Sequence, residues 1–245
     1  MEAIWDKERE PQWRDRVADV KLVIDSLGDL ESRFPELRGK INRDQVGVGG
    51  HSYGAFTAML IGGVKTFGNP PLQLADPRVK AIIAMSPQGP AANRGLTAES
   101  FSDLRVPTMF MTGSEDRGAA ESEDANWRKM AFDYSAPGDK YFVLIPGARH
   151  SSFTGTSSAA FEVTDRGSSQ GMYPGGNPNN PYGQSNTQPG GATPRYIGDR
   201  RIFGTIKVAS LIFWEAYLKN ETKARDLLQP DKFKSAVPGV ELIRK

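Results

Sequence analysis

The sequence predicts an α/β fold in which helices cover both faces of a mostly parallel sheet. Four short apolar segments lack the alternation of apolar and polar residues that a half-exposed strand shows. Helical patterns separate these segments along the chain, which is the order of a parallel sheet with helical crossovers. The length of 245 residues suits one such domain, and we expect residues 1–245 to form it.

The N-terminal part is expected to supply two helices and the first strand. Residues 15–34 carry apolar residues at helical spacing, and Pro35 ends or follows this helix. Residues 45–50 place β-branched valines between glycines and predict a short buried strand. A second helix, rich in small residues, is expected over 53–64. The apolar stripe of the first helix consists of Val17, Val20, Ile24 and Leu27.

Three further strands and two further helices complete the expected fold. Continuous apolar runs at 79–86, 106–112 and 140–146 predict the strands. Aromatic and apolar residues within 122–134 predict a helix before the last of these strands. The apolar stripe of 201–219 predicts a long helix after it.

Residues 156–198 differ in composition from the rest of the chain. Their central part, 167–194, consists mostly of Gly, Pro, Asn, Ser and Gln, and cannot bury enough apolar surface to offset the entropy cost of ordering it. We expect a flexible surface insertion within the domain. The alternative is a mobile flap over a site, with Tyr173 and Tyr182 as contacts.

Composition narrows the classes of function. The 31 basic and 29 acidic residues are mixed along the chain, which argues against nucleic-acid binding. No apolar run approaches the roughly 18–20 residues that span a bilayer, so no membrane span is expected. The N-terminus lacks the apolar centre of a signal peptide, which predicts a cytoplasmic protein, or a secreted or periplasmic one if an upstream segment has been removed.

Cysteine and histidine counts limit the chemistry further. The chain has no cysteine, which excludes disulfides and a cysteine nucleophile. It has two histidines, far apart in sequence, and its carboxylates are scattered, so no metal site and no cofactor are expected. Any mechanism that needs a histidine base has only these two candidates.

Residues 50–54, with the sequence GHSYG, fit the pattern G-x-S-x-G. They lie directly after an expected strand and directly before an expected helix, the setting of a nucleophile elbow. Such a turn is tight, and we expect the glycine on either side of Ser52 to be required. The N–H of Tyr53 would then face a developing oxyanion. The alternative is a glycine-rich turn in which Ser52 caps the helix.

A serine hydroxyl needs a base, and His150 is the better of the two candidates. His150 follows the fourth expected strand, and parallel strands end at the same edge of a sheet, so it can meet Ser52. The side chain of His51 leaves the elbow in another direction and is expected to pack beside it. The alternative for His150 is a solvated loop residue.

The acid of the triad should follow a strand that lies between those of the serine and the histidine. Asp116 and Glu115 both follow the run 106–112, and we choose Asp116. The order Ser52, Asp116, His150 is the order that this connectivity requires. Arg117 is either a solvated residue or a partner of the acid. Asp116 would hold the imidazole in the correct tautomer and stabilise the imidazolium.

Three residues are candidates for the substrate-binding wall. Gln88 follows the second strand at the same edge of the sheet, and Trp127 and Phe153 could add apolar surface. Ordinary packing explains each of them equally well.

Several segments together resemble a known group. The chain is similar to the dienelactone-hydrolase-like branch of the α/β-hydrolases, which includes proteins like bacterial platelet-activating-factor acetylhydrolases, chlorophyllases and cutinase-like polyesterases. The resemblance covers 15–155 and 200–228 and implies hydrolysis of carboxylic esters. True dienelactone hydrolases have a cysteine nucleophile, so their substrate is not expected here. The segments that carry the resemblance are GVGGHSYGAFTAMLIGG, DPRVKAIIAMSPQGP, VPTMFMTGSEDRG and IFWEAYLK.

One departure from this group affects the expected function. Such hydrolases have further strands before the helix at 15–34, and a loop there supplies the second oxyanion N–H. Without these strands the first strand would expose an edge, so we expect a homodimer or a partner chain along it. The main functional hypothesis is a serine esterase. The alternative is a catalytically inactive or accessory module that binds a ligand or partner, and an acyltransferase, lipase or amidase with the same triad is a third possibility.

Overall fold

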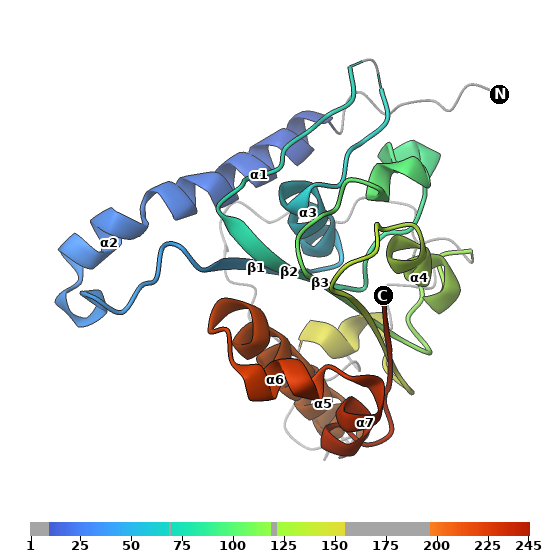
Figure 1. Cartoon of the computed structure of the whole chain (residues 1–245). Helices are drawn as coiled ribbons and strands as arrows, with labels where there is room; N and C mark the ends of the chain where they lie inside the picture. Colours follow the sequence, from blue (N-terminus) through green and yellow to red (C-terminus); the bar gives the residue numbers. More distant parts are fainter. Residues whose placement is uncertain (1–9, 69, 119–121, 155–196) are drawn as a thin grey trace, which may run out of the picture.

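The computed structural model describes residues 10–68, 70–118, 122–154 and 197–245, which form helices around a five-stranded sheet (Figure 1). The strands lie in the order β1-β2-β3-β4-β5. Neighbours among the first four are parallel, and the last is antiparallel to β4. The expected α/β class with a mostly parallel sheet is confirmed. The strands are β1 (Val46–His51), β2 (Val79–Met85), β3 (Thr108–Gly113), β4 (Lys140–Ile145) and β5 (Glu241–Arg244).

Helices cover both faces of the sheet. The helices α1, α3 and α4 lie on one face, and α5, α6 and α7 lie on the other (Figure 1). Each expected strand and helix has a counterpart, within a few residues at its ends. The helices are α1 (Glu10–Asp25), α2 (Leu27–Arg33), α3 (Tyr53–Gly62), α4 (Ala125–Asp133), α5 (Ile197–Leu218), α6 (Thr222–Leu227) and α7 (Pro230–Ala236).

The central strands have buried side chains on both faces, which explains their continuous apolar sequences. Ile82 and Phe110 point into the core under α3 and α4, whereas Ile83 and Met111 point into the core under α5. Because successive side chains of a strand alternate between faces, each central strand contributes to two separate cores. The polar side chains of such a strand are buried as well, as Thr108 and Thr112 of β3 are.

The expectation of a buried first strand is wrong, because β1 lies at the edge of the sheet. Its residues are half-buried, and Gly49 is exposed. The glycines of β1 instead allow α5 to approach closely. A Cβ added to Gly47 would lie 2.7 Å from the indole of Trp214, and one added to Gly49 would lie 3.3 Å from it. The alternation of valine and glycine in β1 is therefore explained by the close approach of Trp214, and not by burial in the middle of the sheet.

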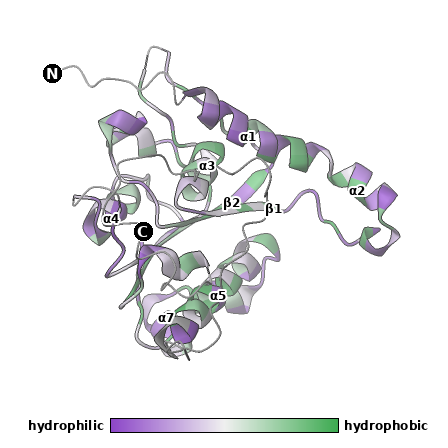
Figure 2. Cartoon of the chain, turned by 180° about the vertical axis from the view of Figure 1, so that it is seen from behind, coloured by the Kyte–Doolittle hydropathy of each residue, from purple (hydrophilic) through white to green (hydrophobic). Residues whose placement is uncertain are grey.

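The single helix expected over 15–34 is two helices that meet at Ser26. The hydroxyl of Ser26 donates a hydrogen bond to the carbonyl of Leu22, at 2.7 Å. Back-bonding of this kind bends helices. The second helix, α2, projects past the edge of the sheet (Figure 1), and hydrophilic stretches occur along both α1 and α2 (Figure 2). Leu22, Val23 and Phe34 are exposed there.

The C-terminal elements α6, α7 and β5 have no counterpart among the expected elements. The strand β5 pairs with β4 through only four residues, too few for a periodic pattern to be recognised. Beyond it, the main-chain N–H of Lys245 donates to the carbonyl of Lys140 at 3.0 Å, and the N–H of Lys140 donates back at 3.1 Å. These bonds fix the end of the described chain against the sheet.

The insertion expected at 156–198 falls outside the described residues, apart from its last two positions, where α5 begins. The two tyrosines considered as flap contacts, Tyr173 and Tyr182, lie outside them as well. Both hypotheses for this segment stay predictions.

The aromatic cluster under α5 provides a test of the core. Phe213 is fully buried, and its ring centroid lies 4.9 Å from that of Tyr217 and 5.4 Å from that of Trp214. We expect Phe213→Ala to lower the free energy of unfolding by about 3–5 kcal/mol, because it leaves a cavity. Val208→Ala, at an exposed position of the same helix, should change it by less than about 0.5 kcal/mol. Urea unfolding measures both, and equal midpoints would contradict this account of the core.

Candidate active site

Ser52 lies in a strained turn between β1 and α3. Its backbone angles are φ 55° and ψ −117°, a region that residues with a side chain rarely adopt. The N–H of Ser52 donates to the carbonyl of Met85 at 2.9 Å, which continues the ladder between β1 and β2 by one residue. Strain of this kind persists only where the surroundings hold it, and it is concentrated at functional sites. The turn presents the side chain of Ser52 at the carboxyl edge of the sheet.

The two glycines of the motif are not equivalent. A Cβ added to Gly50 would lie 2.2 Å from the carbonyl oxygen of Gly54, so no larger residue fits there. A Cβ added to Gly54 would meet nothing within 4 Å among the described residues. The expectation that both glycines are required is therefore wrong for Gly54. The turn depends on close contact between the Gly50 α-carbon and the backbone of the first turn of α3.

His150 begins a short 3₁₀ helix that follows β4, and its ring lies between two partners. Its Nε2 is 2.9 Å from the hydroxyl oxygen of Ser52, and its Nδ1 is 2.9 Å from Oδ1 of Asp116. The carboxylate accepts only, so the proton of the neutral ring belongs on Nδ1. Nε2 is then the acceptor for the hydroxyl proton of Ser52. The side chain of His150 is 29 % exposed, which leaves it open to a reactant.

Asp116 is fully buried in the loop after β3. Its second oxygen, Oδ2, accepts a hydrogen bond from the hydroxyl of Thr112 at 2.9 Å. Burial acts to raise the pKa of the Asp116 carboxyl. The hydrogen bond from His150, the charge of Arg128 and a contact with Ser86 outweigh burial and hold this pKa below its usual value. The carboxylate is therefore the stable form in the buried position.

The loops that carry the acid and the histidine touch each other directly. A Cβ added to Gly113, at the end of β3, would lie 1.9 Å from the carbonyl oxygen of Ala148. The N–H of Glu115 donates to the same carbonyl at 3.1 Å. This contact fixes the separation of Asp116 and His150, which would otherwise depend on two independent loops.

Arg128 is the one charged member of the cluster that the sequence pattern did not indicate. It comes from α4, and only 2 % of its side chain is exposed. Its Nε lies 3.0 Å from Oδ1 of Asp116, and its Nη2 lies 3.3 Å from Nδ1 of His150. Its Nη1 donates to the carbonyls of Ser86 and Pro87, at 2.9 and 3.1 Å. In a helical pattern an arginine is expected to face the solvent. Only the residues that lie around Arg128 in the fold show that it is buried.

The alternative charged residues of the same loop point away from the cluster. Glu115 is exposed, and its carboxylate pairs with Arg149 at 2.9 Å. Arg117 is 65 % exposed and lies 3.9 Å from the carboxylate of Asp124. Neither contacts the imidazole of His150 in the structure, and the ion-pair partner of Asp116 is Arg128 rather than Arg117.

His51, the other histidine, packs beside the cluster. Its ring centroid lies 4.6 Å from that of His150 and 5.7 Å from that of Phe153, on which it stacks. Burial lowers the pKa of His51 to about 4, and the charge of His150 adds to this effect. His51 is therefore neutral near pH 7 and adds no positive charge beside His150.

The three candidates for a substrate wall lie near this edge of the sheet in different environments. Gln88 is buried, and its Oε1 has no hydrogen-bond partner among the described residues. The indole N–H of Trp127 donates to the carbonyl of Pro90 at 2.9 Å. Phe153 is part of the core under α5 and stacks on His51. Packing accounts for Phe153 and for the indole N–H of Trp127, whereas Gln88 retains an unused acceptor.

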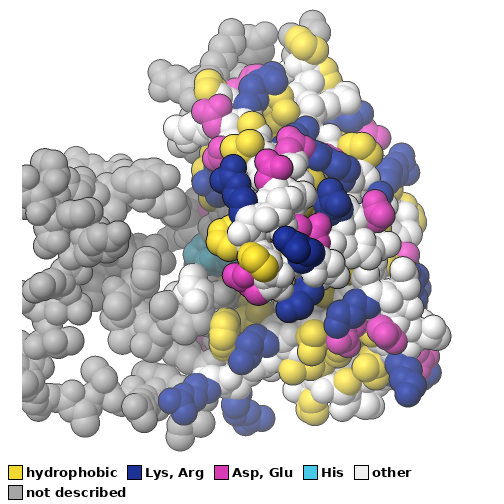
Figure 3. All heavy atoms as spheres, turned by 90° about the vertical axis from the view of Figure 1, so that its left-hand side faces the viewer, with side chains coloured by type: hydrophobic (Ala, Val, Ile, Leu, Met, Phe, Trp, Pro, Cys, Tyr) yellow, Lys and Arg dark blue, Asp and Glu magenta, His cyan; other side chains and the backbone are white. Residues whose placement is uncertain are grey.

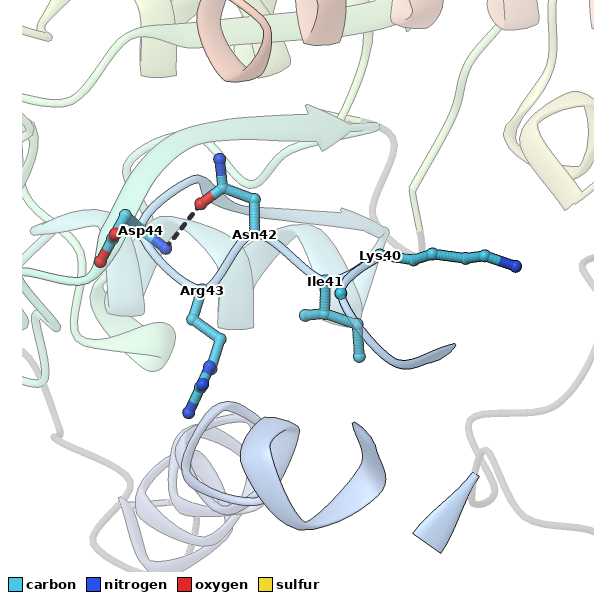
Figure 4. A pocket seen from close by; sticks show the side chains of 6 residues that line it. Lys40, Ile41, Asn42, Arg43 and Asp44 are labelled. Atoms are coloured by element: carbon cyan, nitrogen blue, oxygen red, sulfur yellow. Dashed lines mark hydrogen bonds between the residues drawn. The ribbon is translucent and has the colours of Figure 1, made fainter. Parts of the chain in front are cut away.

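A hollow of the described surface lies away from this cluster. It is lined by 39–44, in the loop before β1, where the side-chain carbonyl of Asn42 accepts from the N–H of Asp44 at 3.1 Å (Figure 4). Arg43 points toward α2, where it lies 3.7 Å from the carboxylate of Glu31 (Figure 4). The hollow contains none of the strained or buried groups described above.

Two kinds of feature are absent from the described parts of the chain. None of the helices in these ranges has the length and apolar character needed to cross a bilayer. No three His, Asp or Glu side chains of these ranges gather closely enough to hold a metal ion.

Comparison with known proteins adds no assignment. No protein-family model matches the chain, and a search of curated proteins finds no match.

The unequal glycines give a test of the turn at Ser52. We expect Gly50→Ala to lower the esterase activity predicted for Ser52 by about 10²-fold or more, because relieving the clash with Gly54 displaces the hydroxyl. Gly54→Ala is the matched control and should retain activity within a few-fold, since its position has room. Rates with a nitrophenyl ester measure both variants. Equal losses would show that the turn does not depend on the Gly50 contact.

Proposed function

We propose that the chain is a serine hydrolase that cleaves carboxylic esters through an acyl-enzyme on Ser52. The observation that carries this proposal is the continuous chain of contacts from Ser52 Oγ through the His150 ring to Asp116, with both distances 2.9 Å. The strained backbone of Ser52 supports it independently. Ser52, Asp116 and His150 follow β1, β3 and β4 and lie far apart in the sequence. Local sequence alone would therefore not bring them into this chain of contacts.

In the proposed mechanism His150 is first a base and then an acid. As the Ser52 oxygen attacks the ester carbonyl, its proton moves to Nε2 of His150. The tetrahedral intermediate collapses when Nε2 returns that proton to the leaving alcohol, and Ser52 carries the acyl group. A water then attacks the acyl-enzyme, with His150 taking the water's proton and giving it to Ser52. Asp116 keeps the Nδ1 proton in place and balances the charge of the imidazolium.

The oxyanion is proposed to bind at the N-terminus of α3. The N–H of Tyr53 is the first of this helix and follows Ser52 directly, and the positive end of the helix dipole points to the same place. Donors that are oriented before the reaction stabilise the developing charge at little reorganisation cost. In the enzymes that the sequence resembles, the second donor comes from a loop among strands before the helix at 15–34, so another segment or a partner chain would have to supply it here.

The class of substrate rests on the resemblance together with the groups present. The segments similar to the dienelactone-hydrolase-like branch, with serine as nucleophile, favour carboxylic esters over lactones of dienes. The proposed nucleophile, base and acid are all side chains of this chain, so the proposed step uses no cofactor. The unused acceptor of Gln88, after β2 at the same edge, favours contact of this residue with the substrate.

Replacement of the proposed nucleophile is the direct test. We expect Ser52→Ala to lower kcat for nitrophenyl esters by about 10⁶-fold, because no other group can form the acyl-enzyme. A fluorophosphonate probe should label the unmodified chain at Ser52 and should not label this variant. Ser102→Ala, at an exposed position, is the control and should behave as the unmodified chain does.

The opposite results would favour other functions. Turnover that persists in Ser52→Ala would exclude the proposed nucleophile. A folded chain that neither reacts with the probe nor cleaves esters of two to twelve acyl carbons would favour the inactive or accessory binding module.

We propose in addition that a second copy of the chain covers the free edge of β1. Among the described residues no strand pairs with this edge. Exposed apolar residues lie on α1 at Leu22 and Val23 and on α5 at Val208 and Leu211. On the side where α2 projects, apolar side chains lie among both signs of charge (Figure 3), and the net charge of +2 gives little repulsion between copies. A strand edge can pair with its own copy around a twofold axis.

Light scattering tests this second proposal. We expect a mass near twice the 26.8 kDa of one chain. Leu211→Lys should shift the mass toward one chain, because Leu211 lies one helical turn from the Trp214 that covers β1. Met130→Lys, on the exposed side of α4, is the control and should leave the mass unchanged. A single-chain mass for the unmodified protein at high concentration would contradict the proposal.

A further inference from the structure

We propose that Arg128 is a positioning residue of the Ser52–His150–Asp116 triad, whose buried guanidinium ties the Asp116 carboxylate to His150 and to the end of β2. The inference rests on the proposed function and extends it to a fourth side chain. Arg128 does not reach the Ser52 hydroxyl, so it would act through Asp116 and His150 rather than on the substrate.

The guanidinium has four partners: the carbonyls of Ser86 and Pro87, the carboxylate of Asp116 and the ring of His150. Its Nη1 donates to the carbonyls of Ser86 and Pro87, which fixes the plane of the group against the loop after β2. From that plane its Nε lies 3.0 Å from Oδ1 of Asp116, in an ion pair without a directional hydrogen bond. A lysine could supply the charge but not this planar fork. Arg128 therefore connects the loop after β2 with the loop after β3.

The shared oxygen of Asp116 links the arginine to the histidine. Oδ1 is 2.9 Å from Nδ1 of His150 and 3.0 Å from Nε of Arg128. Nη2 of Arg128 is farther from the same ring nitrogen, at 3.3 Å. The shorter, charge-assisted contact is the one with the carboxylate, so Nδ1 keeps its proton and donates it to Asp116. Displacement of the carboxylate would leave Nδ1 to accept from Arg128, which is the wrong tautomer for catalysis.

The charge of Arg128 also protects the reactive protonation state. Asp116 is fully buried and Arg128 nearly so, and water screens the pair little. Uptake of a proton by Asp116 removes the negative charge that faces this fixed cation, and the charge of Arg128 helps to hold the pKa of the Asp116 carboxyl below its usual value. Removing the cation favours protonation of Asp116. The anionic acid would then be lost at a higher pH.

The other charged and titratable groups around the pair do not replace this cation. His51, packed from β1 against His150, is neutral near pH 7, because burial lowers its pKa to about 4. Arg94 lies over the Trp127 ring, with its Cζ 5.3 Å from the ring centroid, and pairs with Glu123 at 2.5 Å. Glu115 and Arg149 form their own exposed pair on the outer side of the loop.

The test compares three variants by the pH dependence of kcat/KM for nitrophenyl acetate. Arg128→Met removes the charge at similar length, and Arg128→Lys keeps the charge without the fork. Arg94→Met removes a neighbouring arginine that does not touch the triad. Thermal unfolding and circular dichroism show whether each variant is folded.

For Arg128→Met we expect kcat to fall about 10²-fold with little change in KM, because the triad loses its alignment while the acyl site is intact. The acid limb of its profile should move to higher pH. Arg128→Lys should lose about tenfold in kcat and keep the acid limb in place, since the charge remains and the fork is lost. Arg94→Met should match the unmodified enzyme in both respects.

The proposal is overturned if folded Arg128→Met shows an unmoved acid limb, since a merely structural arginine would lower the rate equally at all pH values. If Arg128→Met does not fold, Arg128→Lys decides: a kcat equal to that of the unmodified enzyme overturns the positioning role. An unmodified chain without esterase activity or probe labelling refutes the proposed function instead, and the two failures are therefore distinguished.

Discussion

The parallel pairing of β1 to β4 is the constraint on which the site depends. Because four neighbouring strands run in the same direction, the residue after each of them emerges at one edge of the sheet. Ser52, Ser86, Asp116 and His150 each follow one strand in turn. Ser52 and Ser86 both have positive φ, so two adjacent strand ends turn sharply at this edge. The apolar strands and their helices hold this row of residues in place.

The buried charge of Asp116 favours one arrangement of the side chains around it. A carboxylate without solvent is costly unless each oxygen has a partner. At Asp116 the partners come from β3, α4 and the loop after β4: Thr112, Arg128 and His150. Loss of any one leaves a buried charge or a buried oxygen unsatisfied. The packing of three elements is thus linked to the protonation state of one side chain.

The sequence was most informative where one physical rule acts alone. Continuous apolar runs predicted three of the four parallel strands, and the rule that the carboxyl ends of parallel strands meet at one edge pointed to the loops of Asp116 and His150. Prediction failed where the outcome depends on contacts across the fold. Arg128 is buried only because three elements surround it, the bend at Ser26 depends on a single hydroxyl, and Gly47 faces an indole from a helix far along the chain. The short strand β5 has too few residues for a periodic pattern to reveal it.

The two edges of the sheet differ in how readily they can accept another strand. The outer edge of β5 is four residues long and carries Glu241 and Arg244, features that discourage further pairing. The edge of β1 is longer, rich in glycine and free of charged side chains. Growth of the sheet by added chains is thus favoured in one direction only. An assembly that uses β1 from both partners consumes the single receptive edge of each, so it closes as a pair and does not extend into a fibre.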